Sequence, residues 1–217
     1  MTWARVGWID PDSMTAAPGW LQPLIDAVPS LTAEQVTQAV PPHGHGVHAA
    51  VLVLFGPDRD LLLIERATQM RAHAGQPAFP GGRLDPDDAD AAAAAVREAV
   101  EETGLDASGV VVFGRLPDLW IPVTDFVVTP VVAWWARPSA VSAQDPAEVS
   151  ATHRVSLVDL ADPARRCLVR HPSGYVGPGF EVHGLLIWGF TAGVISVVID
   201  LLGLTIPWEP RYVDLPV

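Results

Sequence analysis

Three glutamates in the middle of the chain have the type and spacing needed to bind divalent cations. Glu98, Glu101 and Glu102 stand at positions i, i+3 and i+4, so a helix would project all three from nearly one face. Like charges at this spacing cost roughly 0.2–0.5 kcal/mol per pair, and Arg97 relieves one of them because it can pair with Glu101. Clusters of oxygen ligands suit Mg²⁺ or Mn²⁺. On these residues alone, a solvated acidic helix face stays the alternative.

The residues around the glutamates predict one amphipathic helix. Asp87 is the candidate N-cap, and Ala91–Ala95 is a run of the strongest helix former. Gly104 stands where a left-handed C-cap belongs, so the helix should end near Thr103. A stripe of mostly small apolar residues suits close packing against a sheet; it consists of Ala92, Ala95, Val96 and Ala99.

The segment Arg97–Leu105 reads Arg-Glu-Ala-Val-Glu-Glu-Thr-Gly-Leu. It resembles the second half of the Nudix hydrolase box, R-E-U-x-E-E-x-G-U with U a bulky apolar residue, although Ala99 is small for U. The first half departs from the box, because Asp88 stands in place of a glutamate and its gap to Arg97 is one residue longer. The resemblance implies that the metal ligands are Glu98, Glu101 and Glu102.

A second motif lies upstream of the helix. It comprises Leu62–Ala67, Arg71, Gly75 and Phe79–Gly82. It resembles the signature of the coenzyme A pyrophosphatase branch of the Nudix family, from which only Ile64 differs, at a threonine position. The longer aspartate-rich loop before the helix also fits that branch. The resemblance implies that the residues binding the substrate are Arg66, Arg71, Gly81 and Gly82.

The resemblance also implies a fold and a reaction. The fold is the Nudix α/β/α sandwich, an α/β architecture with a mixed β-sheet between helices. Glu98 and Glu102 would hold the principal Mg²⁺ or Mn²⁺, with Glu101 completing or supporting its shell. The catalytic set would also include Arg97 and a base, either Glu102 or Glu148, and coenzyme A would be cut to 3′,5′-ADP and 4′-phosphopantetheine. Two alternatives stay open, namely a Nudix hydrolase of another nucleoside diphosphate such as NADH or ADP-ribose, and a non-catalytic Nudix-fold binding protein.

The remaining sequence is consistent with one main domain and two extensions. We expect an N-terminal helical extension over residues 1–42, the Nudix domain over 43–206 and an irregular tail over 207–217. Two short helices are expected in the extension, the second of them with a capping box formed by Thr32 and Gln35. The expected helices and strands are Trp20–Val28, Thr32–Val40, Val47–Phe55, Leu61–Glu65, Val110–Leu116, Val127–Trp135 and Val155–Leu160, the last following the loop that carries Glu148.

Composition restricts the partners and the compartment. The formal net charge is −12, which argues against a nucleic-acid backbone as partner because such binding needs clustered cations. The lone Cys167 cannot form an internal disulfide, and the first residues carry no apolar signal-peptide core. We therefore expect a cytoplasmic protein that acts on a small molecule, with the oligomeric state left open, a homodimer included.

The apolar run Leu185–Leu202 approaches the length of a membrane span. Asp200 lies near its end, no basic cluster flanks it, and its glycines suit a helix packed within a protein. We therefore predict a buried helix rather than a membrane tether. A hairpin turned by Gly177–Gly179 is expected to precede it.

Overall fold

The computed structural model describes residues 6–37, 39, 46–67 and 75–215. Within these residues, nine strands form a mixed sheet in the order β1-β6-β8-β2-β3-β4, with β5, β7 and β9 paired to β2, β8 and β3. β2 and β8 run parallel, and the other pairs are antiparallel. The strands are β1 Trp8–Ile9, β2 Val47–Phe55, β3 Asp60–Arg66, β4 Pro77–Ala78, β5 Gly81–Arg83, β6 Val110–Arg115, β7 Leu119–Ile121, β8 Phe126–Trp135 and β9 Val149–Ser156.

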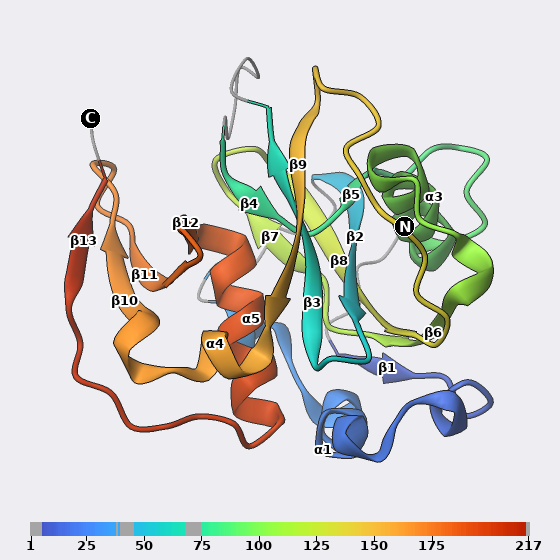
Figure 1. The fold of residues 1–217 in the computed structure, drawn as a ribbon, viewed down its shortest axis with the longest axis horizontal. Coiled ribbons are helices and arrows are strands. Elements are labelled where there is room, and N and C mark those ends of the chain that lie inside the picture. Colours follow the sequence, from blue (N-terminus) through green and yellow to red (C-terminus); the bar gives the residue numbers. More distant parts are fainter. Residues whose placement is uncertain (1–5, 38, 40–45, 68–74, 216–217) are drawn as a thin grey trace.

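Helices cover both faces of this sheet (Figure 1). Helix α3 (Ala91–Thr103) lies on one face and helix α5 (Gly189–Leu201) on the other. Strand β2 is apolar on both sides, since Leu52 and Leu54 pack into the α3 cluster while Val53 and Phe55 pack into the α5 cluster. A strand buried on both faces reads as a continuous apolar run. The α/β sandwich with a mixed sheet is therefore confirmed.

The N-terminal arm is more than a helical extension. Its helices α1 (Gln22–Ala27) and α2 (Ala33–Val36) are present, and the capping box of Thr32 and Gln35 is formed. The second helix ends before the expected Val40, because Thr37 is already extended, with φ −142° and ψ 148°. The arm also supplies β1, which pairs with β6 at the edge of the main sheet.

The C-terminal third corrects two expectations. Gly177–Gly179 lies inside strand β11 (Val176–Val182) rather than in a turn. The hairpin turns instead at His183 and Gly184, both with positive φ. The tail is not wholly irregular, because β13 (Tyr212–Asp214) pairs in parallel with β10 (Arg166–Arg170). The resulting second sheet has the order β12-β11-β10-β13, with β12 at Leu185–Trp188.

The segment Val155–Leu160 was expected to be a strand and is largely a helix. Strand β9 ends at Ser156, whose hydroxyl caps helix α4 (Leu157–Ala161) by accepting a hydrogen bond from the Val158 N–H. A serine that can cap a helix outweighs the β-propensity of the valines that flank it.

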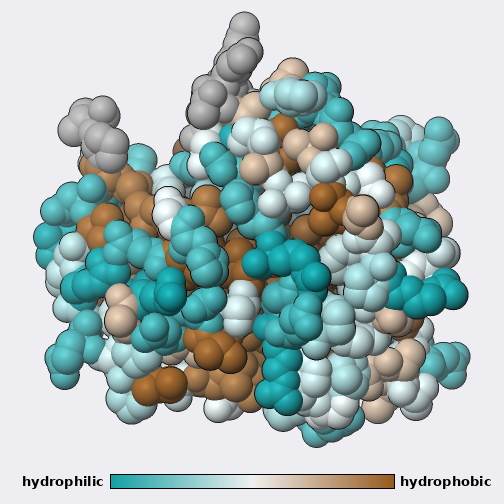
Figure 2. Space-filling model, in the orientation of Figure 1, coloured by the Kyte–Doolittle hydropathy of each residue, from teal (hydrophilic) through white to brown (hydrophobic). Residues whose placement is uncertain are grey.

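The apolar run near the C-terminus is divided between β12 and α5. Helix α5 packs its buried side chains against the main sheet and the arm, including Ile195, Val198 and Ile199. In the part of the chain that the structure describes, no helix has the length and apolarity to cross a membrane. Hydrophilic residues cover much of the face seen in Figure 2, with apolar patches between them.

Candidate active site

Helix α3 presents the three glutamates, as predicted, but it begins later than expected. Asp90, not Asp87, is the N-cap, and its side chain accepts a hydrogen bond from the Ala93 N–H at 2.9 Å. The helix ends at Thr103, and Gly104 adopts the left-handed conformation with φ 68°. An aspartate caps the start of the helix and a left-handed glycine ends it, as expected, although the capping aspartate is Asp90 and not Asp87.

The glycines of β5 allow helix α3 to lie directly against the strand. The Gly81 N–H donates a hydrogen bond to Glu102 Oε2 at 2.9 Å. A Cβ on Gly82 would lie 2.5 Å from Glu98 Oε1, closer than real Cβ contacts. Gly81 has φ 155°, and a Cβ there would lie 2.6 Å from Val51 Cα. These two glycines therefore let the strand lie close against two carboxylates, with a hydrogen bond to one of them.

Arg97 organises the charges at this end of the helix. Its Nε and Nη2 donate to the two carboxylate oxygens of Asp88 at 3.0 and 2.9 Å, a forked geometry typical of strong arginine–carboxylate pairs. Its Nη1 donates to Glu98 Oε1 at 2.9 Å and to Glu101 Oε2 at 3.2 Å. The predicted pair with Glu101 is confirmed, and the main partner is Asp88. The arginine lowers the pKa of Asp88, and its carboxylate partners raise the pKa of Arg97.

Glu102 is the most deeply placed of the three glutamates. It is 8% exposed, and burial raises its pKa to about 7, against the opposing effects of the Gly81 N–H and Arg66. The nearby charges of Glu98 and Glu148 raise this pKa further. A buried carboxylate surrounded by other carboxylates has a strong electrostatic preference for a bound proton or cation.

The other two glutamates differ from it and from each other. Glu98 is partly buried, and burial raises its pKa against the effect of Arg97. The Glu101 side chain is 59% exposed. Within the described residues, no three His, Cys, Asp or Glu side chains already converge as a metal cluster. The donor set nevertheless fits a hard divalent cation, because Glu98 and Glu102 supply carboxylate oxygens that repel each other in its absence.

Two residues from distant segments act on Glu102 through their charges. Arg66 and Glu148 both act on its pKa, and their strands meet, since Arg66 pairs with Val149 and the Ala67 N–H donates to the Glu148 carbonyl. The Nε of Arg66 is buried and has no hydrogen-bond partner in the described structure. The structure thus brings together most of the expected site residues. Arg71 lies outside the described residues.

Sequence spacing missed the forked pair of Asp88 with Arg97. Nine positions separate the two residues, and no helical or strand period links them. The Nudix box could have revealed this pair, because Asp88 occupies the position at which the box has a glutamate. Asp88 has a shorter side chain than the usual glutamate, and the loop between Asp88 and Arg97 is one residue longer.

Comparisons with known proteins identify the family. The NUDIX domain model matches residues 44–172. The chain is 37% identical over 167 residues to the uncharacterized Nudix hydrolase NudL of Shigella flexneri, covering 72% of this chain and 83% of that protein. It is 39% identical over 157 residues to NudL of Escherichia coli strain K12, covering 68% and 78%.

Among solved structures, the Nudix hydrolase RenU of M. smegmatis is 23% identical, with a TM-score of 0.48, covering 72% of this chain and 86% of that one. The protein has an α/β fold, and the carboxylates of its site, Glu98 and Glu102, lie against the two glycines of strand β5. The chain belongs to the Nudix hydrolase family. Its members generally use divalent metal ions to hydrolyse nucleoside diphosphate derivatives.

Proposed function

We propose that the protein hydrolyses the diphosphate bond of coenzyme A, or of its acyl or oxidised derivatives, to 3′,5′-ADP and 4′-phosphopantetheine. The observation that carries the proposal concerns Arg66, a residue of the coenzyme A signature: its charge acts on the pKa of Glu102, and its Nε is buried without a hydrogen-bond partner among the described residues. A guanidinium in that position suits a phosphate oxygen, because its fork of donors matches phosphate geometry.

The acidic site and the anionic substrate would repel each other without a cation between them. Glu98 and Glu102 would hold Mg²⁺ or Mn²⁺, with Glu101 supporting, and the ion would polarise the phosphate and acidify a bound water. Glu102 or Glu148 would accept the proton of the attacking water. Arg97, fixed by Asp88, holds Glu98 in place through its Nη1.

The remaining substrate contacts come from the signature. Arg66 and Arg71 would bind the phosphates, and the β5 glycines Gly81 and Gly82 leave room for the substrate to approach the carboxylates closely. Cys167 is buried and unpaired, which is compatible with the cytoplasmic location that we propose.

The test is mass analysis of the products formed from coenzyme A and its acyl esters with Mg²⁺ or Mn²⁺. We expect 3′,5′-ADP together with 4′-phosphopantetheine or its acyl form. Dephospho-coenzyme A, NADH and ADP-ribose serve as comparison substrates. Equal turnover of the substrates that lack the 3′-phosphate would favour a broader nucleoside diphosphate hydrolase. No turnover of any of them would favour a binding protein.

A variant separates site chemistry from general damage. Glu98→Gln removes one ligand charge while keeping the shape, and kcat/KM should fall by about 100-fold or more. Asp87→Asn is the matched control, because Asp87 is exposed in the same acidic loop. Normal turnover by Glu98→Gln would refute the metal assignment.

A further inference from the structure

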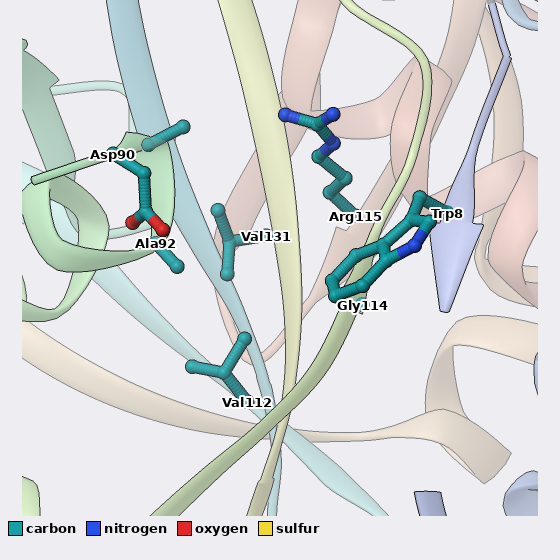
Figure 3. A pocket seen from close by; sticks show the side chains of 8 residues that line it. Trp8, Asp90, Ala92, Val112, Gly114, Arg115 and Val131 are labelled. Atoms are coloured by element: carbon teal, nitrogen blue, oxygen red, sulfur yellow. The ribbon is translucent and has the colours of Figure 1, made fainter. Parts of the chain in front are cut away.

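A cavity lies on the side of helix α3 away from the catalytic glycines. It is open to solvent on one side and has a volume of about 260 Å³, and it lies between the start of α3 and strands β1, β6 and β8. Its walls are mostly apolar. Figure 3 shows Trp8 on one side, Asp90 and Ala92 on the opposite side, and Val112 and Val131 between them. The rise of the helix from Asp90 to Glu98 is about 12 Å, so the cavity is separate from the carboxylate site.

The Trp8 indole is unusually open for its type. It is 50% exposed and forms one wall of the cavity (Figure 3). Its backbone is fixed, because Trp8 pairs with Arg115 across β1 and β6. Gly114 permits this pairing, since a Cβ there would lie 2.7 Å from Ile9 Cδ1. An accessible indole on a paired strand is a stacking surface for a planar ring.

Arg115 lines the same cavity on the Trp8 side (Figure 3). Its Nε is buried without a hydrogen-bond partner, and the guanidinium makes no ion pair with any described residue. A partly buried guanidinium without a carboxylate partner is costly to maintain. An anionic ligand group in the cavity would pair with the charge of this guanidinium.

Asp90 lies on the side of the cavity opposite Trp8 (Figure 3). One of its carboxylate oxygens accepts the capping hydrogen bond from the Ala93 N–H, and a carboxylate has capacity to accept more. A ligand group facing Asp90 must therefore donate a hydrogen bond. The cavity combines a ring surface, a cation without an ion-pair partner among the described residues, and a hydrogen-bond acceptor at separate places.

We propose that this cavity is a second nucleotide site that takes an adenine mononucleotide. The base stacks on Trp8, its exocyclic amine donates to Asp90, and the phosphate pairs with Arg115. The volume lies just below the usual range of about 300–1,000 Å³ for ligand pockets, so it suits the base and ribose of one nucleotide rather than a dinucleotide. Because Asp90 caps the helix that carries the glutamates, a ligand here contacts the catalytic helix at its start.

The test is calorimetric titration of the full chain with 5′-AMP in EDTA, which removes divalent cations from the catalytic site. Wild-type protein should bind 5′-AMP more tightly than 5′-UMP, which lacks an exocyclic amine. Trp8→Ala should weaken binding about tenfold or more, Arg115→Met should weaken it comparably, and Trp8→Phe should keep most of it. Absence of 5′-AMP binding to the wild type would overturn the proposal.

Two controls locate the binding. Glu98→Gln should leave the affinity unchanged, and so should Arg170→Met, which alters an arginine on the second sheet. Loss of binding in Glu98→Gln with retention in Trp8→Ala would place 5′-AMP in the catalytic site and overturn the proposal, as would equal affinity for 5′-UMP. Thermal melts of Trp8→Phe and Asp90→Asn, which keep the ring and the cap, separate lost binding from lost folding.

Discussion

Arg97 in helix α3 and Arg166 in strand β10 are both withdrawn from solvent but have opposite surroundings. Arg97 donates hydrogen bonds to three carboxylates, those of Asp88, Glu98 and Glu101. Arg166 is 5% exposed and lies against the rings of Phe180 and Trp208. One of its nitrogens donates to Ser196 Oγ, and another is buried without a partner.

The two surroundings suit different roles. Around α3, like charges are concentrated at a cost in stability, which is expected where a site must bind a cation. In the second sheet, a charge is buried by apolar packing, and burial lowers the pKa of Arg166. We therefore expect changes near α3 to affect catalysis more than stability, and changes near Arg166 to have little effect on catalysis.

The largest effect is expected from Gly82→Ala. The new Cβ would overlap the Glu98 carboxylate and displace it, and misplacing a site group by about 1 Å can cost about 100-fold in rate. Steady-state kinetics and Mn²⁺ titration measure the loss. Gly193→Ala is the control, because a Cβ there meets nothing within 4 Å and should stabilise α5 by roughly 0.5–1 kcal/mol. Full activity in Gly82→Ala would show that the close contact between Gly82 and the Glu98 carboxylate is not needed for catalysis.

A smaller effect is expected from Asp88→Asn, which removes the charge that holds Arg97. Residues that orient metal ligands typically contribute about 10–100-fold, so kcat/KM should fall within that range and the apparent Mn²⁺ affinity should weaken. Asp85→Asn is a matched control, because Asp85 is exposed and lies 3.8 Å from Arg97. If both variants behave alike, the forked pair does not position the site.

The pH dependence of the metal-free protein tests the electrostatics of Glu102. Folding raises its pKa from 4.5 to about 7, so the folded state holds a proton that the unfolded chain releases between these values. The contribution of Glu102 to stability should therefore be greatest below about pH 4.5 and fall as pH rises through 7, by roughly 3 kcal/mol at most. Denaturant melts across pH measure this slope.

Two companion measurements complete that experiment. Glu102→Gln should flatten the dependence, and saturating Mg²⁺ should offset the loss at high pH because the ion binds the deprotonated carboxylate. A slope that persists in Glu102→Gln would assign the proton to another group.

The smallest effect is expected from Arg166→Met. Replacing a buried and incompletely paired charge by an apolar side chain of similar length is often close to neutral, so the free energy of unfolding should change by about 1 kcal/mol or less and specific activity should hold. Chemical denaturation and kinetics check both. A large loss of activity without unfolding would show that the second sheet takes part in catalysis, contrary to the roles inferred for Arg97 and Arg166.

Periodicity and caps predicted much of the fold. Strand β2 has the expected bounds, and the end of α3 at Thr103 was set by Gly104. The predictions failed where two local signals competed, as at Ser156, whose capping hydroxyl turned an expected strand into α4. They failed also at Gly177–Gly179, where glycine and proline suggested a turn but neighbouring strands pair with the segment. Cross-strand partners are distant in sequence, so local composition could not reveal them.

The spacing of the glutamates was enough to predict that three carboxylates share one face of a helix closed by glycine, because helix geometry converts spacing into direction. The differences among the three arise from packing between segments that are distant in the chain. Glu102 is buried against Gly81, Glu98 lies against Gly82, and Glu101 is exposed to solvent. The reason is physical: burial, and with it the pKa of a carboxylate, depends on which distant segment packs over it. That segment is β5, which the sheet places beside β2.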